Sequence, residues 1–290
     1  MKLPSAVALL LSAALMAQQV QAKLTWTVKG TQNGVPIPPS EIILKPFEAA
    51  YGHNFGPSGP TTAAAAASVG RVARNRMVKR ANPIATSANW CGSVRNATTS
   101  NRIKLIHGYF QHPTCTKRAG VTTYPQAAAS WIGIDGDSST TLLQMGTVCK
   151  IDNSTGIVRN EAWWQWVPDA AMTLASMPVH AGDWFQVTIN TTSATSAVIS
   201  LTNVNTLTAI TINLSAGTSL ARIDADWIVE RPAYGSGLAG FASFTETWFQ
   251  EAYATLANGA SLGILGAKQY QITGGCSSAE YDNADLSAWS

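Results

Sequence analysis

Short runs of alternating apolar and polar residues constrain the fold of this chain more than any other feature. Turn residues separate these runs, for example at 181–183 and 203–205, and no long stretch after residue 80 has convincing helical periodicity. The runs are KLIHGYF, AWWQWV, DWFQVTIN, AVISLTNV, LTAITINL and ADWIVE. Strands that recur at short intervals predict one all-β domain, an antiparallel sandwich or barrel, whose concave face would suit an extended polymer.

The first 22 residues have the features of a secretory signal peptide. Lys2 precedes an apolar run from Leu3 to Met16, and the segment ends with the small-residue pattern VQA at 20–22. No later apolar stretch approaches the roughly 20 residues needed to span a bilayer. We therefore expect a secreted, extracellular and soluble protein with no membrane partner.

The next segment differs from the rest of the chain in charge. Residues 1–80 contain nine Lys or Arg and two Asp or Glu, whereas residues 81–290 contain ten and fourteen, so the formal charges are +7 and −4. Lys79-Arg80 resembles a dibasic processing site, which predicts a basic prosegment at 23–80 and a mature domain at 81–290. A flexible basic linker is the alternative. Because the positive charge lies in the part to be removed, it indicates an inhibitory prosegment on an acidic body and no nucleic-acid partner.

The cysteines predict disulfides. All four follow the proposed cleavage point and none forms a CxxC pair; they are Cys91, Cys115, Cys149 and Cys276. In an exported protein this pattern favours two disulfides over a metal or redox site. Three pairings are possible, and the close spacing favours Cys91 with Cys115, which leaves Cys149 with Cys276. Four sequons also fit an exported glycoprotein, with acceptors at Asn96, Asn153, Asn190 and Asn213.

The run SWIGIDGDSSTTLLQMG at 130–146 contains a candidate functional amide. Alternation places Trp131 and Asp135 on one face of its first half, and Gln144 on the polar-facing side of its second half. The turn residues at 136–139 predict a hairpin that brings these three side chains together. Surface packing is the alternative for an aromatic and an amide in a hairpin.

A second candidate stretch is IDADWIVE at 223–230. Alternation places three carboxyl groups on one face, those of Asp224, Asp226 and Glu230. Like charges on one sheet face disfavour simultaneous ionisation, which raises the proton affinity of some members and suits an enzyme that works in acid. An ordinary solvated strand face is the alternative.

Other catalytic systems have little support in this sequence. None of the four histidines lies in an HExxH zinc pattern, and no GxSxG nucleophile elbow is present. The remaining polar chemistry is carboxylate and amide, with no metal and no cofactor. A Glu can activate water as a general base and a Gln amide can stabilise an oxyanion, so this pair suffices for peptide hydrolysis.

Six motifs in order carry a resemblance to a known family. They are NWCG at 89–92, SWIGIDGD at 130–137, LLQMG at 142–146, AWWQWVPD at 162–169, HAGD at 180–183 and DADWIVERP at 224–232. Together they resemble the glutamic endopeptidases, or eqolisins, of filamentous fungi. The resemblance covers essentially all of residues 86–250.

The resemblance implies a lectin-like (concanavalin A-like) double-sheet sandwich that cleaves proteins at acid pH. Its catalytic dyad would be Gln144 and Glu230, in the concave groove. The other residues expected to line this groove are Trp131, Asp135, Trp164 and Asp226. We also expect a zymogen with polypeptide substrates and its own prosegment as inhibitor, and a monomer, since nothing in the sequence predicts oligomers.

Two positions depart from the family pattern. Gln165 replaces the glutamate of AWYEWYP, and Val148 replaces a common aspartate just past the dyad glutamine. The acidic surround of the dyad is therefore thinner, which affects how far the pH optimum and specificity of the family transfer. An inactive homologue is an alternative.

Two further alternatives use carbohydrate as the ligand. A lectin-like module could stack sugars on a platform of Trp163, Trp164 and Trp166. A glycoside hydrolase would need an acid partner for Glu230 at roughly 5 to 10 Å.

Overall fold

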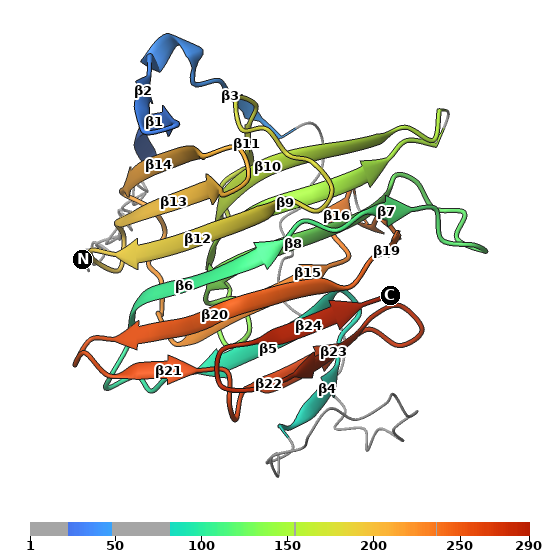
Figure 1. The fold of residues 1–290 in the computed structure, drawn as a ribbon. Coiled ribbons are helices and arrows are strands. Elements are labelled where there is room, and N and C mark those ends of the chain that lie inside the picture. Colours follow the sequence, from blue (N-terminus) through green and yellow to red (C-terminus); the bar gives the residue numbers. More distant parts are fainter. Residues whose placement is uncertain (1–22, 48–81, 154, 236) are drawn as a thin grey trace, which may run out of the picture.

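The computed structural model describes residues 23–47, 82–153, 155–235 and 237–290. Two large β-sheets pack face to face (Figure 1), which confirms the predicted all-β sandwich. Within these residues the helical structure is a single 3₁₀ turn, η1 (Pro39–Glu41). The predicted signal peptide and the Lys79-Arg80 site lie outside the described residues.

Sheet A contains both N-terminal and C-terminal strands. Across the sheet its order is β2 (Val35–Ile37), β1 (Thr25–Gln32), β14 (Thr208–Ser215), β13 (Ala197–Asn203), β12 (Trp184–Thr191), β6 (Ile103–Gln111), β20 (Thr247–Leu256), β24 (Leu286–Trp289) and β23 (Ser277–Glu280). A short strand, β21 (Ser261–Gly263), also pairs with β20.

Sheet B contains both sequence regions that predict chemistry. Its order is β3 (Leu44–Pro46), β11 (Met172–Leu174), β10 (Val158–Val167), β9 (Leu142–Ile151), β8 (Gln126–Ile134), β15 (Asp224–Glu230), β5 (Trp90–Asn96), β22 (Lys268–Gln271) and β4 (Ile84–Thr86). The β22–β4 pair is parallel, as is the pair of β8 with β18 (Gly240–Phe241), so the sheet is mixed. Two small ribbons complete the fold, β16 (Ala233–Tyr234) with β17 (Gly237–Leu238) and β7 (Cys115–Thr116) with β19 (Ser243–Phe244).

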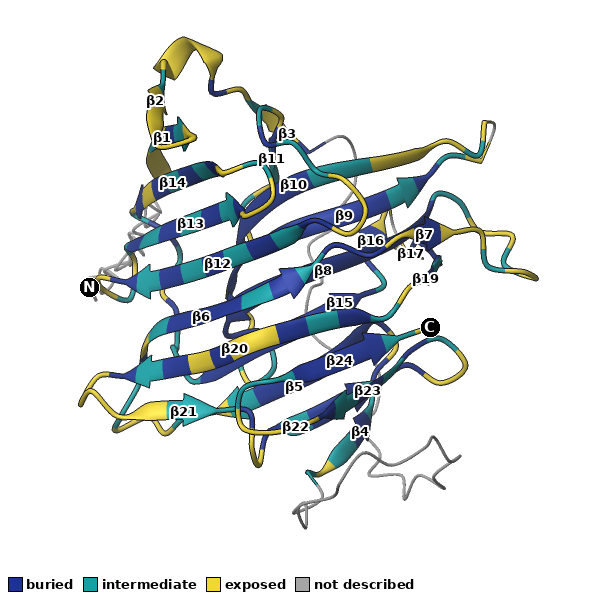
Figure 2. Ribbon diagram, viewed as in Figure 1, coloured by how far each residue is buried: buried dark blue, intermediate teal, exposed yellow. Residues whose placement is uncertain are grey.

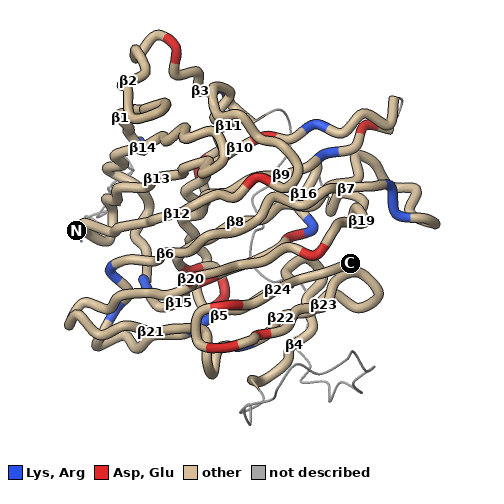
Figure 3. The backbone as a smooth tube through the Cα atoms, in the orientation of Figure 1, with Lys and Arg blue, Asp and Glu red and all other residues tan. Residues whose placement is uncertain are grey.

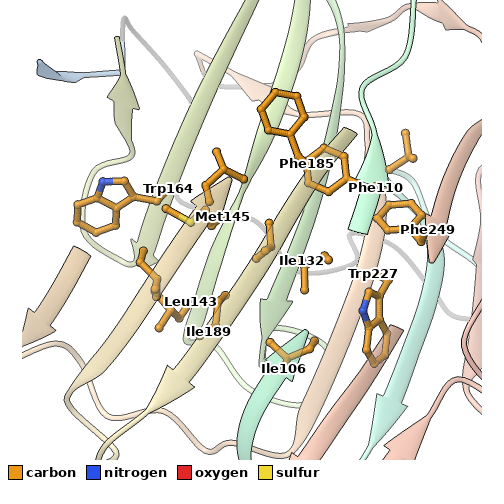
Figure 4. Packing of buried hydrophobic residues seen from close by; sticks show 14 of the residues in the cluster. Ile106, Phe110, Ile132, Leu143, Met145, Trp164, Phe185, Ile189, Trp227 and Phe249 are labelled. Carbon is orange, nitrogen blue, oxygen red and sulfur yellow. The ribbon is translucent and has the colours of Figure 1, made fainter. Parts of the chain in front are cut away.

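The two sheets differ in what covers their outer faces. In β12 and β13 buried residues alternate with partly exposed ones, so one face packs on the core and the other meets solvent (Figure 2). By contrast, every residue of β8 and β15 is buried, so both faces of sheet B are covered at its centre. The core between the sheets includes Ile132, Phe185 and Trp227 (Figure 4).

The predicted hairpin at 130–146 is confirmed. β8 and β9 pair antiparallel, with Gly133 opposite Gln144. The connecting turn begins with Asp135 and Gly136, which have φ angles of 73° and 105°. A glycine at the second position adopts such a φ without steric strain.

The predicted disulfide pairing is wrong. The bonds join Cys91 to Cys276 and Cys115 to Cys149, with Cα–Cα distances of 6.1 and 6.2 Å. After β5 the chain crosses from sheet B to β6 of sheet A, so the short sequence spacing does not bring Cys91 near Cys115. Cys115 instead lies in β7 beside β9, which carries Cys149.

All four predicted glycosylation asparagines reach the surface. Asn96, Asn153 and Asn213 are exposed and Asn190 is half-buried. The amide nitrogen of Asn96 donates to Asp224 Oδ1 at 2.7 Å. Occupancy of these sites by glycans stays a prediction.

Charged side chains are few, which leaves most of the backbone in Figure 3 tan. Apolar helices of membrane-spanning length do not occur among the residues that the structure describes.

Buried His112 predicts a loss of stability in acid. Its Nδ1 lies 2.7 Å from Thr147 Oγ1, and burial lowers the pKa of the imidazole from 6.5 to about 4. As the pH falls from 6.5 to 4, the unfolded chain gains this proton before the folded one, so the free energy of unfolding drops by about 3 kcal/mol. His112→Gln should lack this loss in urea unfolding measured at pH 7 and pH 4.

The control for this experiment is His180→Gln, because His180 is exposed. It should retain the pH dependence of the wild type to within about 1 kcal/mol. An unchanged pH dependence in His112→Gln would show that the buried imidazole does not resist protonation.

Candidate active site

Cross-strand pairing aligns the candidate residues in three rows on one face of sheet B, the face turned away from sheet A, called here the site face. Directly paired residues share a face of an antiparallel sheet. The first row is Gln165, Gln144, Gly133, Asp226, Val94 and Lys268. The second is Trp163, Gly146, Trp131, Ile228, Gly92 and Tyr270. The third is Glu161, Val148, Ala129, Glu230 and Trp90.

Glu230 is a fully buried carboxyl group with two hydrogen-bond donors. Trp131 Nε1 donates to its Oε2 at 2.8 Å, and Asn89 Nδ2 donates to its Oε1 at 3.2 Å. Burial raises the pKa of Glu230 from 4.5 to about 8, while the two hydrogen bonds act in the opposite direction. Neither donor atom can accept, so both favour the ionised carboxylate once burial is relieved.

Gln144 is held by a short chain of amides. Its Nε2 donates to Gln165 Oε1 at 3.3 Å, and Gln165 Nε2 donates to the backbone oxygen of Asp169 at 2.8 Å. Gln165 therefore supplies the acceptor that orients Gln144, without carrying a charge. Gln144 Oε1 is buried and has no hydrogen-bond partner among the described residues.

The Trp131 indole separates Gln144 from Glu230. A Cβ on Gly133 would lie 2.9 Å from Trp131 Cζ3, so this end of the ring covers the glycine beside Gln144. The other end carries Nε1, which is bonded to Glu230. A Cβ on Gly146 would lie 2.6 Å from Trp131 Cβ, so both glycines are required for this placement. Gln144 and Glu230 thus flank one aromatic ring on the site face.

Asp226 lies across Gly133 from Gln144. It is fully buried, and neither carboxyl oxygen has a hydrogen-bond partner in the described part of the chain. Burial raises its pKa well above the ordinary value, and the carboxyl groups of Asp224, Asp137 and Asp135 raise it further. Asp226 is therefore a neutral acid in acidic solution, in the same row of the site face as the candidate amide.

Two expected groove residues have other roles. Asp135 accepts hydrogen bonds from the backbone N–H groups of Arg222 at 2.7 Å and Ile223 at 2.8 Å, so it anchors the chain that enters β15. Trp164 packs in the core between the sheets, with its ring 5.7 Å from that of Trp26. The expectation that Trp164 lines the groove is wrong because alternation through Gln165 places Trp163 on the site face.

Some residues of the site face were missed in the sequence. Asn89 lies in the NWCG motif and was not recognised as a donor to Glu230. Lys268 and Tyr270 lie in no motif, and they meet Asp137 through a 2.7 Å ion pair and a hydrogen bond from the Tyr270 hydroxyl. Burial raises the pKa of Tyr270, as does its hydrogen bond to Asp137. No group of three or more His, Cys, Asp or Glu residues that could hold a metal ion occurs in the described ranges.

The fold and the site together define a class of protein: a double-sheet sandwich with a buried carboxyl group and an amide on one sheet face. Residues 88–287 match the model of the Peptidase A4 family. The chain belongs to this family, which confirms the resemblance found in the sequence.

Two characterised relatives match part of the chain. Aspergillopepsin-2 of Aspergillus niger is 35% identical over 132 residues, which are 44% of this chain and 46% of that protein. Scytalidopepsin B of Scytalidium lignicola is 28% identical over 148 residues, which are 49% of this chain and 51% of that protein. The chain therefore matches about half the length of each relative.

Solved structures share the fold. A scytalido-glutamic peptidase with a transition state analog inhibitor superposes with a TM-score of 0.59 at 23% identity, over 70% of this chain and 98% of that one. SCP-B, a member of the eqolisin family in complex with the tripeptide Ala-Ile-His, gives a TM-score of 0.57 at 24% identity over the same shares. Both likenesses support the sandwich architecture.

The raised pKa of Glu230 predicts that this group destabilises the fold as the solution becomes alkaline. The folded protein keeps the proton up to about pH 8, whereas the unfolded chain loses it above 4.5. The free energy of unfolding should therefore fall by about 4 kcal/mol between pH 5 and pH 8 on account of this group. Glu230→Gln should lack this component in denaturant titrations at the two pH values.

Glu251→Gln is the matched control, since Glu251 is exposed on β20 of the other sheet. It should follow the wild type. Parallel pH dependence of Glu230→Gln and wild type would mean that Glu230 is not held protonated by burial.

Proposed function

We propose that this protein is a glutamic endopeptidase, which hydrolyses proteins by direct attack of water. The observation that carries the proposal is the placement of Glu230 and Gln144 on either side of Trp131 on one face of sheet B. Membership of the Peptidase A4 family supports the same reaction class. Glu230 would be the general base and acid, and Gln144 the oxyanion stabiliser.

Glu230 acts on the attacking water. The carboxylate takes a proton from water as the water oxygen bonds to the scissile carbonyl carbon. The resulting carboxylic acid gives that proton to the leaving amine as the C–N bond breaks. In the buried state its pKa of about 8 keeps Glu230 neutral in acid. Water that enters the site with the substrate solvates the Glu230 carboxyl group. The donors Trp131 and Asn89 then stabilise its ionised form.

Gln144 acts on the oxygen of the scissile carbonyl. Gln165 accepts one of the two N–H groups of Gln144 Nε2, which leaves the other to donate to the oxyanion. A donor fixed before the reaction avoids reorganisation at the transition state. Because Gln165 is neutral, this orientation does not depend on pH in the acidic range.

The route to the active enzyme belongs to the same proposal. The chain is secreted behind its signal peptide as a zymogen, and acid releases the basic prosegment when carboxyl groups of the site face gain protons. Val148 and Gln165 are uncharged residues in the rows that contain Glu230 and Gln144. The carboxyl groups of Asp226 and of its neighbours Asp224, Asp137 and Asp135 therefore dominate the release of the prosegment in acid.

The structure removes the platform on which the sugar-binding alternative depended. Trp164 and Trp166 lie in the core between the sheets, whereas Trp163 lies on the opposite face of β10. The three side chains therefore cannot stack one sugar.

Substitution of the dyad tests the proposed function. Gln144→Ala should lower kcat on a denatured protein in acid by about 100-fold, since an oxyanion donor is lost. Glu230→Gln should lower it by about 1,000-fold or more, since neither water nor the leaving amine can then exchange a proton with the side chain. The measurement is the initial rate of substrate cleavage by each purified variant after processing.

The matched controls are Gln250→Ala and Glu251→Gln, both exposed on β20. They should retain the rate of the wild type. Full activity in either dyad variant would refute the assignment.

A further inference from the structure

Residues 23–47 lie outside the region that matches the family, yet they extend both sheets. β1 pairs with β14 through eight residue pairs, from Thr25 with Ser215 to Gln32 with Thr208. β3 pairs with β11 through three, from Leu44 with Leu174 to Pro46 with Met172. One segment thus supplies strands near the same edge of sheet A and of sheet B.

Apolar side chains of this segment enter the core between the sheets. Leu24 and Ile42 are buried in it, and the ring of Trp26 meets that of Trp164 edge to face. Backbone pairing and apolar contact together hold the segment on the sandwich, so it is part of the folded domain in this form of the protein.

Phe47 directly follows β3, and its side chain lies on the site face. Its backbone N–H donates to Ala171 O at 2.9 Å, and its side chain belongs to the apolar cluster of the site face. The ring meets Trp163 edge to face at 6.4 Å, and Lys150 Nζ lies 5.3 Å from the ring centroid. Phe47 is 8% exposed, so its side chain is buried.

The position of Phe47 relates it to the dyad. On the site face, Val148 lies between Gly146, which pairs with Trp163, and Lys150. Val148 belongs to the third row, which runs through Ala129 to Glu230. The Phe47 ring therefore lies near the row of the proposed general base, in the direction of the sheet edge.

The chemistry around Phe47 suits an aromatic side chain. The Trp163 ring and the Val148 side chain both present apolar surface. An aspartate in place of Val148 would have disfavoured an apolar side chain next to it. Lys150 is paired with Glu161 at 3.3 Å, so its stem can pack on a ring while its charge is balanced. An ammonium group near the ring adds a cation–π attraction.

We propose that residues 23–47 form an inhibitory arm whose Phe47 fills a subsite that binds an aromatic or large apolar side chain of the polypeptide substrate. This inference rests on the proposed function, because it places the subsite in the same active site. The arm and substrate then compete for one subsite. Release of the arm requires its strands to separate from β14 and β11, in addition to any cleavage of the chain.

The first test uses the full, unprocessed chain with Phe47→Ala. Loss of the ring should open the subsite, so that initial cleavage of a protein substrate in acid rises roughly tenfold or more over wild type, with a shorter lag. Lys45→Ala is the control, because Lys45 is an exposed residue of the same strand. An unchanged rate and lag in Phe47→Ala would overturn the proposal.

A second measurement identifies the ligand class. Peptide substrates with Phe or Ala at successive positions are compared for the processed forms of wild type and of Trp163→Ala, in which the arm no longer fills the subsite. A preference for Phe at one position should fall roughly tenfold in the variant while preferences at other positions persist. A uniform loss of rate, or an unchanged preference, would contradict the subsite.

A third measurement separates the arm from the proposed function. Hydrogen exchange of residues 42–47 is followed in the Glu230→Gln background, with Phe47→Ala or Lys45→Ala added. Exchange should accelerate only with Phe47→Ala, whether or not the chain is a peptidase. Equal exchange would overturn the arm even if the dyad assignment stands, whereas activity in Glu230→Gln would overturn the dyad alone.

Discussion

The burial of Glu230 in the middle of sheet B is the constraint on which the rest of the site depends. β8 and β15 are buried along their whole length, so a carboxyl group on the site face has no water to solvate it. Trp131 and Asn89 supply donors instead. Trp131 can do so only because Gly133 leaves room for its ring and Gly146 for its Cα and Cβ atoms. The motifs around these residues thus describe one packed unit.

The fold and the shared face of Asp226 and Glu230 could be predicted from the sequence because both depend on local pattern. Alternation identified the strands and placed Asp226 and Glu230 on one face. The same reasoning failed at Asp135, where a positive φ ends the alternation and turns the carboxylate to the backbone. It failed for the disulfides because the chain changes sheets between Cys91 and Cys115. Contacts between distant segments, such as Phe47 with Trp163, leave no local signal.

Uncharged residues lie next to the proposed catalytic pair, Gln144 and Glu230, on the site face. Gln165 orients Gln144 as a neutral acceptor, and Val148 provides an apolar surface where the family pattern has an acid. Both departures remove charge on the side of the sheet where the N-terminal segment arrives. The loss of these two acidic residues therefore makes that side of the sheet more favourable for burial of the Phe47 ring. Carboxyl groups remain on the opposite side, at Asp226 and Asp137.

The pH dependence of kcat for Trp131→Phe, which reports the enzyme–substrate complex, tests the central claim most directly, that the Trp131 donor poises Glu230 as the general base. Phenylalanine keeps an aromatic ring over Gly133 and removes the N–H. The pKa of Glu230 should then rise, because the ionised form loses a donor, and the acid limb of the profile should move up by about one pH unit. An acid limb at the wild-type position, with only the height of the profile reduced, would contradict the account.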